Sequence, residues 1–133
     1  MNTGEIKLPE LHTDIPDDIV ENAKHCAEEL GSLIHEEFTF VGSARPSDED
    51  LATLLLNKTW KPQLSVTGAE GLPTLEKGGN VLRSYTTLKL SIRIPPGVNA
   101  EAAAAKLKSV LETDTPYNST VHCEVEKAKS GWA

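Results

Sequence analysis

The alternation of apolar and polar residues between positions 87 and 94 constrains the fold of this chain more than any other feature. One face carries Leu88, Leu90, Ile92 and Ile94, and the other carries Thr87, Lys89, Ser91 and Arg93. A period of two residues over such a length predicts a strand with one buried and one polar face. Positions 63–67 show the same pattern, with Leu64 and Val66 inward. Because a glycine-rich connection at 68–80 separates them, we expect two neighbouring antiparallel strands joined by a long loop.

Three helices are also predicted. The first has Asp14 as its N-cap and Gly31 after its last turn. The second starts at the capping-box-like sequence Ser-Asp-Glu-Asp at 47–50. The third covers about 100–112 and follows Asn99, whose side chain is a good N-cap.

Residues 119–127 alternate once more, which predicts a last strand with Val121, Cys123 and Val125 inward. A strand, strand, helix, strand order implies a right-handed crossover that skips one position in the sheet. Either a short strand at 5–8 fills that position, or the chain begins partway through a domain. The predicted fold class is α+β: a two-layer sandwich with an antiparallel ferredoxin-like sheet and helices on one face, incomplete in this chain.

Composition narrows the range of functions. The chain has 133 residues, of which 38% are hydrophobic and 25% charged, as is typical of one globular domain. A net charge of −7 argues against a nucleic-acid surface, which needs clustered lysine and arginine. No apolar run reaches the roughly 20 residues of a membrane span, and no signal-peptide core is present. Cys26 and Cys123 lack motif spacing, so we expect reduced core thiols and a cytoplasmic location.

A metal site is suggested by one stretch and then disfavoured by its surroundings. His12 and Asp14 form a His-x-Asp pattern, and paired glutamates follow at 28–29 and 36–37. Several two-zinc hydrolases bind their metals through such a set. However, Asp14 is better explained as a helix cap, and adjacent glutamates on a helix diverge. No nucleophile motif or phosphate-binding loop occurs either. We therefore predict neither a catalytic residue nor a metal ligand in this chain.

Asn80 and Arg93 are the candidate ligand-binding residues. Arg93 ends the strand that should be central, and Asn80 follows two glycines that let a ligand approach the backbone. A guanidinium fork and an amide suit a carboxylate or an amide carbonyl. The alternative is a surface arginine paired with Glu124 or Glu126, and an asparagine used only for its turn geometry. Arg83 is a weaker candidate of the same kind.

Several short motifs resemble the lid, or dimerisation, domain of M20-family metallopeptidases, a family that includes acetylornithine deacetylase, succinyl-diaminopimelate desuccinylase, aminoacylase and carboxypeptidase G2. They are Thr59-Trp-Lys-Pro-Gln-Leu-Ser-Val-Thr-Gly-Ala-Glu-Gly-Leu-Pro, Gly79-Asn-Val-Leu-Arg, Leu88-Lys-Leu-Ser-Ile-Arg-Ile-Pro-Pro, Thr115-Pro-Tyr and Gly131-Trp132. The resemblance covers about residues 58–132. It implies that 58–133 form the strand-strand-helix-strand core of the lid and that 1–57 are its variable N-terminal helical segment, within one structural domain.

The resemblance also implies a function. The parent would be a zinc-dependent hydrolase of amide or peptide bonds, a deacylase or a peptidase, whose lid pairs with a second lid. Asn80 and Arg93 match the family's residues that bind the substrate carbonyl or carboxylate. The family's zinc-binding domain and the His-Ser-Gly strand of its lid have no counterpart here. We therefore expect a fragment that is not catalytic alone and has no cofactor of its own, the zinc belonging to the absent domain.

The resemblance and the predicted edge strand also indicate which partners the chain would bind. We expect a homodimer, with its seam at the 63–67 strand or the helices beside it, because an unpaired edge strand tends to pair with a copy of itself. The parent's substrate would be a small acyl-amino acid or peptide, with no nucleic acid and no membrane involved. The alternative is a free-standing α+β module that binds a small ligand or serves in assembly, since fold alone does not decide function.

Overall fold

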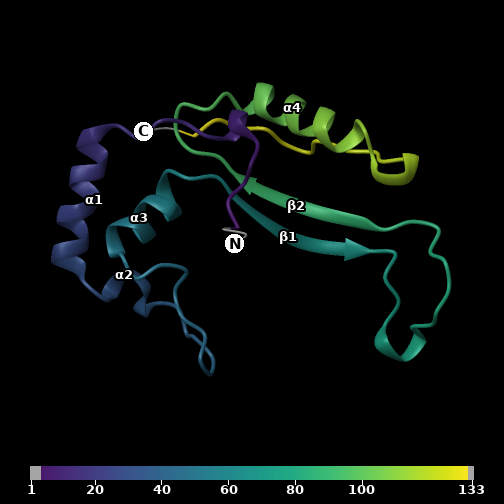
Figure 1. The fold of residues 1–133 in the computed structure, drawn as a ribbon, viewed down its shortest axis with the longest axis horizontal. Coiled ribbons are helices and arrows are strands. Elements are labelled where there is room, and N and C mark those ends of the chain that lie inside the picture. The colour runs from purple at the N-terminus through teal and green to yellow at the C-terminus, as the bar shows by residue number, and fades with distance from the viewer. Residues whose placement is uncertain (1–3, 132–133) are drawn as a thin grey trace. The chain divides into compact units, whose positions relative to one another are not determined.

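The computed structural model describes residues 4–131, so the Trp132 half of the Gly131-Trp132 motif lies outside the described residues. The elements, shown in Figure 1, are helices α1 (Asp17–Leu30), α2 (Leu33–Glu36), α3 (Leu51–Thr59) and α4 (Ala100–Glu112), with strands β1 (Gln63–Glu70) and β2 (Thr87–Arg93). This content confirms the predicted α+β class. Two compact units are present: the hairpin Gln63–Arg93, and the remainder of the chain. Within the described ranges, no helix is long and apolar enough to cross a membrane.

The two strands pair in antiparallel fashion and are joined by a long loop, as the alternation predicted (Figure 1). The pairs on one face, which we call the apolar hairpin face, are Leu64–Ile92, Val66–Leu90 and Ala69–Leu88. A β-bulge adds Thr67 to β1, so that Gly68 lies opposite Lys89. If Thr67 were instead paired opposite Lys89 in a regular ladder, Gly68 rather than Ala69 would continue the apolar hairpin face. The bulge therefore keeps the face continuous across the strand.

The apolar hairpin face was predicted to be buried, and this prediction was wrong. Leu64, Val66, Leu88 and Leu90 are 52%, 58%, 52% and 39% exposed. The reason is that the unit Gln63–Arg93 contains two strands and no α-helix that could cover the face. A two-stranded sheet leaves both of its faces open unless another element packs on one of them.

Helices α1 and α3 contact each other, and the buried residue of each is an alanine, Ala23 and Ala52. Small side chains let two helices approach closely. The cap predictions were partly wrong. The N-cap of α1 is Pro16, not Asp14, and it makes no side-chain hydrogen bond. The C-cap of α1 is Gly31, as predicted, with a φ of 53°.

The start of α3 lies further along the chain than predicted. Its N-cap is Asp50 rather than Ser47, and the Asp50 carboxylate accepts hydrogen bonds from the Thr53 N–H at 3.0 Å and the Thr53 hydroxyl at 2.6 Å. The Thr53 side chain and backbone donors lower the pKa of Asp50. A serine at 47 competes poorly once an aspartate directly precedes the first apolar turn.

Helix α4 begins as predicted. The Asn99 side-chain oxygen accepts from the Ala102 N–H at 2.9 Å, and a three-residue 3-10 turn at Pro9–Leu11 contacts the helix. The buried apolar side chains of this region are small apart from one leucine: Leu11, Val98, Ala100 and Ala103. Cys26 was expected in a core and is instead exposed, whereas Cys123 is half-buried; both are free thiols.

Two predicted strands do not form. Residues 119–127 contain no strand, because the backbone N–H and carbonyl of Cys123 bond to the side chains of Glu112 and Lys108 on α4 instead of to a ladder. Residues 5–8 also contain no strand, and the Ile6 carbonyl accepts a hydrogen bond from His12 Nε2 at 2.6 Å. Among the described residues, the sheet therefore consists of β1 and β2 alone.

Candidate functional site

Arg93 is the last residue of β2 and lies opposite Gln63 on the polar face of the hairpin. Its side chain is exposed. Within residues 4–131, the guanidinium makes no ion pair or side-chain hydrogen bond. An exposed guanidinium on a rigid strand end keeps its donors available for a carboxylate. The strand therefore fixes the direction from which an anionic group can approach Arg93.

Asn80 lies in the loop between β1 and β2 and is also exposed. The loop backbone turns next to it, where the Val81 N–H donates to the Gly79 carbonyl at 2.9 Å. A Cβ built on Gly79 would meet no atom within 4 Å. The space beside Asn80 is therefore open, and a ligand could reach the loop backbone from that side.

The structure does not bring Asn80 and Arg93 together. Arg93 is at the end of β2, whereas Asn80 precedes the start of β2. The strand alone spans about 20 Å at 3.3 Å per residue. The loop leaves the hairpin at the end opposite Arg93 (Figure 1). One carboxylate therefore cannot contact both residues in this conformation, and only an extended ligand could be held at the two ends of β2.

In the structure, the His12 ring of the His-x-Asp stretch contacts the backbone. His12 Nε2 donates to the Ile6 carbonyl, and Asp14 is exposed without capping α1. Glu28 is 3.7 Å from His25 in an exposed pair, and the His35 ring stacks edge-on against Phe40. Across residues 4–131, no group of three or more histidine, cysteine, aspartate or glutamate side chains could hold a metal ion.

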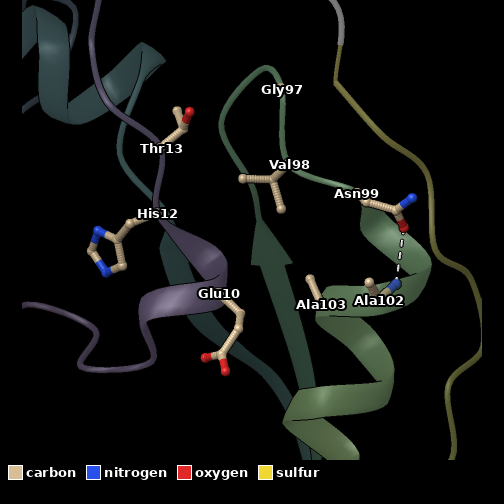
Figure 2. Close-up of a pocket in the computed structure, with 8 residues that line it drawn as sticks. All are labelled: Glu10, His12, Thr13, Gly97, Val98, Asn99, Ala102 and Ala103. Carbon is tan, nitrogen blue, oxygen red and sulfur yellow. Dashed lines mark hydrogen bonds between the residues drawn. The ribbon is translucent and has the colours of Figure 1, made fainter.

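A pocket of about 320 Å³ lies between the Pro9–Leu11 turn and the start of α4 (Figure 2). The residues that line it are Glu10, His12, Thr13, Gly97, Val98, Asn99, Ala102 and Ala103. Figure 2 shows the His12 ring turned away from Val98, and Asn99 is used by its cap bond to Ala102. The pocket therefore offers a mostly apolar surface.

The charged residue at this pocket is also engaged. Glu10 pairs with Lys106 of α4 at 3.2 Å. The hydrogen bond that the Glu10 backbone N–H donates to the Glu10 carboxylate lowers the pKa of Glu10, and so does the nearby Lys106 ammonium. This ion pair joins the N-terminal turn to α4. Sequence reasoning missed the pocket, and the only signal for it was the Gly-Val-Asn loop before the third predicted helix.

A cluster of charged residues joins the end of α4 to the segment that follows. The Glu112 carboxylate accepts from the Cys123 N–H at 2.7 Å, lies 3.0 Å from Lys108 Nζ and 3.8 Å from His122 Nδ1. The Cys123 N–H first, and the Lys108 ammonium second, lower the pKa of Glu112. His122 Nε2 is 3.4 Å from Glu124 on the other side of the ring. The two nitrogens of the His122 ring point to different acids, Glu112 and Glu124. The cluster therefore tethers the segment around Cys123 to the end of α4.

No protein-family model matches this chain, and no curated protein matches it significantly.

Proposed function

We propose that this chain is the lid and pairing domain of an M20-like, metal-dependent amidohydrolase or peptidase. It would hold a small acyl-amino acid or peptide while the chemistry takes place in protein outside these residues. The described residues do not fit a zinc site, so the metal of the parent enzyme would bind elsewhere. A cytoplasmic location is part of the proposal and is supported by two free thiols.

The observation that carries the substrate role is the exposed Arg93 guanidinium at the end of β2. A fork of N–H donors that is held on a strand and not used by another side chain of residues 4–131 is suited to bidentate binding of a carboxylate. The polar face around it supports this role, since its opposite neighbour, Gln63, is uncharged.

Asn80 would bind a second group of the same substrate. Its amide can donate to a carbonyl oxygen, and the space beside Gly79 is open. Because β2 separates Asn80 from Arg93, the proposal requires either an extended substrate or a change in the conformation of the loop. An extended peptide needs about six residues to span the roughly 20 Å of β2, at about 3.3 Å per residue, whereas a small acyl-amino acid would require the change in the loop.

Self-association is the other half of the proposal. Its support is the apolar hairpin face, on which four large side chains are more than one-third exposed. Exposed apolar patches of this kind on small proteins mark contact surfaces. Among the described residues, β1 is paired with β2 on one side only, so its other side could add a strand from a second copy.

The test uses the full-length enzyme that contains this domain. We expect Arg93→Ala to lower kcat/KM by roughly 100-fold, since it removes a charge-assisted contact to the substrate. Arg93→Lys should recover only part of the loss, because an ammonium cannot bind a carboxylate bidentately. Arg45→Ala, at another exposed arginine, is the matched control and should leave kcat/KM unchanged. Wild-type kinetics for Arg93→Ala would remove this residue from the substrate site.

The alternative is a free-standing module that binds a small ligand, and the pocket beside α4 is the observation that favours it. Its apolar lining suits a small uncharged molecule. Ligand screening by NMR separates the two functions. Shifts confined to Val98, Asn99 and Ala103 would favour the module, whereas shifts at Arg93 with N-acyl amino acids would favour the lid.

A further inference from the structure

The second face of the hairpin carries opposite charges at its two ends. This polar hairpin face consists of the pairs Gln63–Arg93, Ser65–Ser91, Gly68–Lys89 and Glu70–Thr87. Glu70 belongs to it because the bulge at Thr67 shifts the alternation of β1. Arg93 at one end and Glu70 at the other are both exposed. The face therefore has a cation at one end and an anion at the other.

The two charges are far apart. Glu70 lies opposite Thr87, which is six residues from Arg93 along β2, so about 20 Å separates the ends at 3.3 Å per residue. Both residues belong to the compact unit Gln63–Arg93, so the hairpin alone sets this separation. Within residues 4–131, the Glu70 carboxylate makes no ion pair, not even with Lys89, the nearest cation on this face. Each charge therefore keeps its capacity for a ligand group of opposite sign.

The middle of the polar hairpin face carries small polar side chains. Ser65 lies directly opposite Ser91, and both are exposed. A hydroxyl can donate and accept hydrogen bonds, so it can bind a peptide backbone whatever side chains the peptide has. Gly68 adds no side chain to the face. This part of the hairpin therefore suits an extended backbone more than any one side chain.

We propose that the polar hairpin face binds a free peptide in extended conformation, with the carboxylate of the peptide on Arg93 and its amino terminus on Glu70. The peptide runs parallel to β2. The inference rests on the proposed function and narrows its substrate class, because an N-acylated amino acid has no ammonium group for Glu70. Glu70 thereby becomes a residue that determines specificity.

The separation of the two charges also selects a length. About six extended residues, at 3.3 Å each, bring both ends of a peptide onto the face. A tripeptide covers about 10 Å and can reach one charge at a time. We therefore expect hexapeptides to bind more tightly than tripeptides of the same composition.

The experiment uses the whole chain and the synthetic hexapeptide Ala-Ser-Ala-Ser-Ala-Ser in three forms: with both ends free, N-acetylated, and C-amidated. Binding is measured by ¹⁵N NMR titration at about pH 6.5, where the amino terminus is charged, and in about 0.02 M salt, where screening is weak. N-acetylation and amidation should each weaken binding to the wild-type chain by about threefold, as expected for the loss of one exposed ion pair. The free tripeptide Ala-Ser-Ala should show a similar loss.

Two variants assign each end of the peptide to its residue. In Glu70→Gln, N-acetylation should have no further effect, whereas amidation should still weaken binding. In Arg93→Ala, the two effects should be reversed. Glu49→Gln, at an exposed acid outside the hairpin, is the matched control and should respond to all three peptides as the wild type does.

Two results would overturn the inference. Binding that depends on the carboxylate and on Arg93, but not on the amino terminus or on Glu70, would reject the role of Glu70 and leave the proposed function standing. Failure of the free hexapeptide to bind at millimolar concentration would reject the peptide site as a whole. The kinetics of Arg93→Ala in the full-length enzyme test the proposed function separately in either case.

Discussion

Gly71 directly follows β1 and has a φ of 80°, and the backbone of Tyr85 and Thr86 passes close to it. A Cβ at this position would lie 2.4 Å from the Tyr85 carbonyl oxygen. Both the backbone conformation and the contact therefore require glycine. Nothing in the sequence distinguished Gly71 from Gly78 and Gly79, which drew attention because they precede Asn80.

We predict that Gly71→Ala destabilises the hairpin by about 2 kcal/mol, from the strained φ and the displaced carbonyl. Urea unfolding followed by the NMR signals of β1 and β2 measures this loss. Gly79→Ala is the control: its Cβ would meet nothing within 4 Å, and we expect a change within about 0.5 kcal/mol. Equal effects at the two glycines would contradict the proposed clash.

Glu112 gives a prediction about pH. Its pKa is lowered from the ordinary 4.5 by the Cys123 N–H and then by Lys108. A lowered pKa means that the folded state favours the ionised form. The tether should therefore be fully formed above pH 4.5 and lost as the pH falls through the lowered value.

The chemical shift of the Cys123 amide proton and its protection factor, which is the intrinsic exchange rate at the same pH divided by the observed rate, measure this tether. Both should stay constant from neutral pH to about pH 5 and change below pH 4.5. Glu112→Gln should lower the protection factor several-fold at neutral pH and remove the acid transition. Glu101→Gln, on the same helix, is the matched control and should leave the amide unaffected. An acid transition that persists in Glu112→Gln would assign it to another group.

At the scale of elements, the caps are a direct test of local sequence reasoning. The sequence predicted Asn99 as the cap of α4 correctly, because the asparagine is followed at once by a run of strong helix formers. Asp14 was predicted to cap α1 and does not, because Pro16 fixes the backbone at the boundary and the helix begins at Asp17, two residues later than an Asp14 cap would place it.

We therefore predict a contrast between two cap variants. Asn99→Ala should destabilise the larger unit by about 1 kcal/mol, since it leaves the Ala102 N–H without its acceptor. Asp14→Ala should change stability by less than about 0.5 kcal/mol. Thermal unfolding followed by circular dichroism at the helix signal compares the two. A larger loss for Asp14→Ala would show that the carboxylate stabilises α1 without a direct cap bond.

A strand could be predicted from the sequence only where its partner strand was the next one along the chain. β1 and β2 lie on either side of one loop, so alternation was sufficient to predict both. Residues 119–127 have the same alternation, yet alternation reports which residues could line a strand and not whether a partner strand is present. The side chains of Lys108 and Glu112 bind the backbone there instead.

At the scale of the whole molecule, the sequence predicted which residues would be exposed and polar but not how far apart they would be. Asn80 and Arg93 are both exposed, as a binding role requires. Their separation depends on the length of β2 and on the direction in which the loop leaves it. Neither quantity is encoded in the short motifs around the two residues.

Net charge gives a prediction at this scale. Each copy carries −7, so two copies repel each other over the distance that salt leaves unscreened. At pH 8 the association constant should rise several-fold between about 0.02 M and about 0.5 M sodium chloride. Sedimentation equilibrium measures it. A constant that falls with salt would indicate that charged pairs across the contact outweigh the net repulsion.

The bulge at Thr67 changes which positions of β1, even-numbered or odd-numbered, point to the apolar hairpin face. Before it, even-numbered positions such as Leu64 and Val66 point to the apolar hairpin face, and after it the odd-numbered Ala69 does. A deletion of Thr67 would therefore remove the bulge and keep Val66 and Ala69 on the same face, whereas pairing Thr67 opposite Lys89 in a regular ladder would move Ala69 to the polar face. Anyone grafting a new surface onto this hairpin must reverse the pattern of the design at that residue.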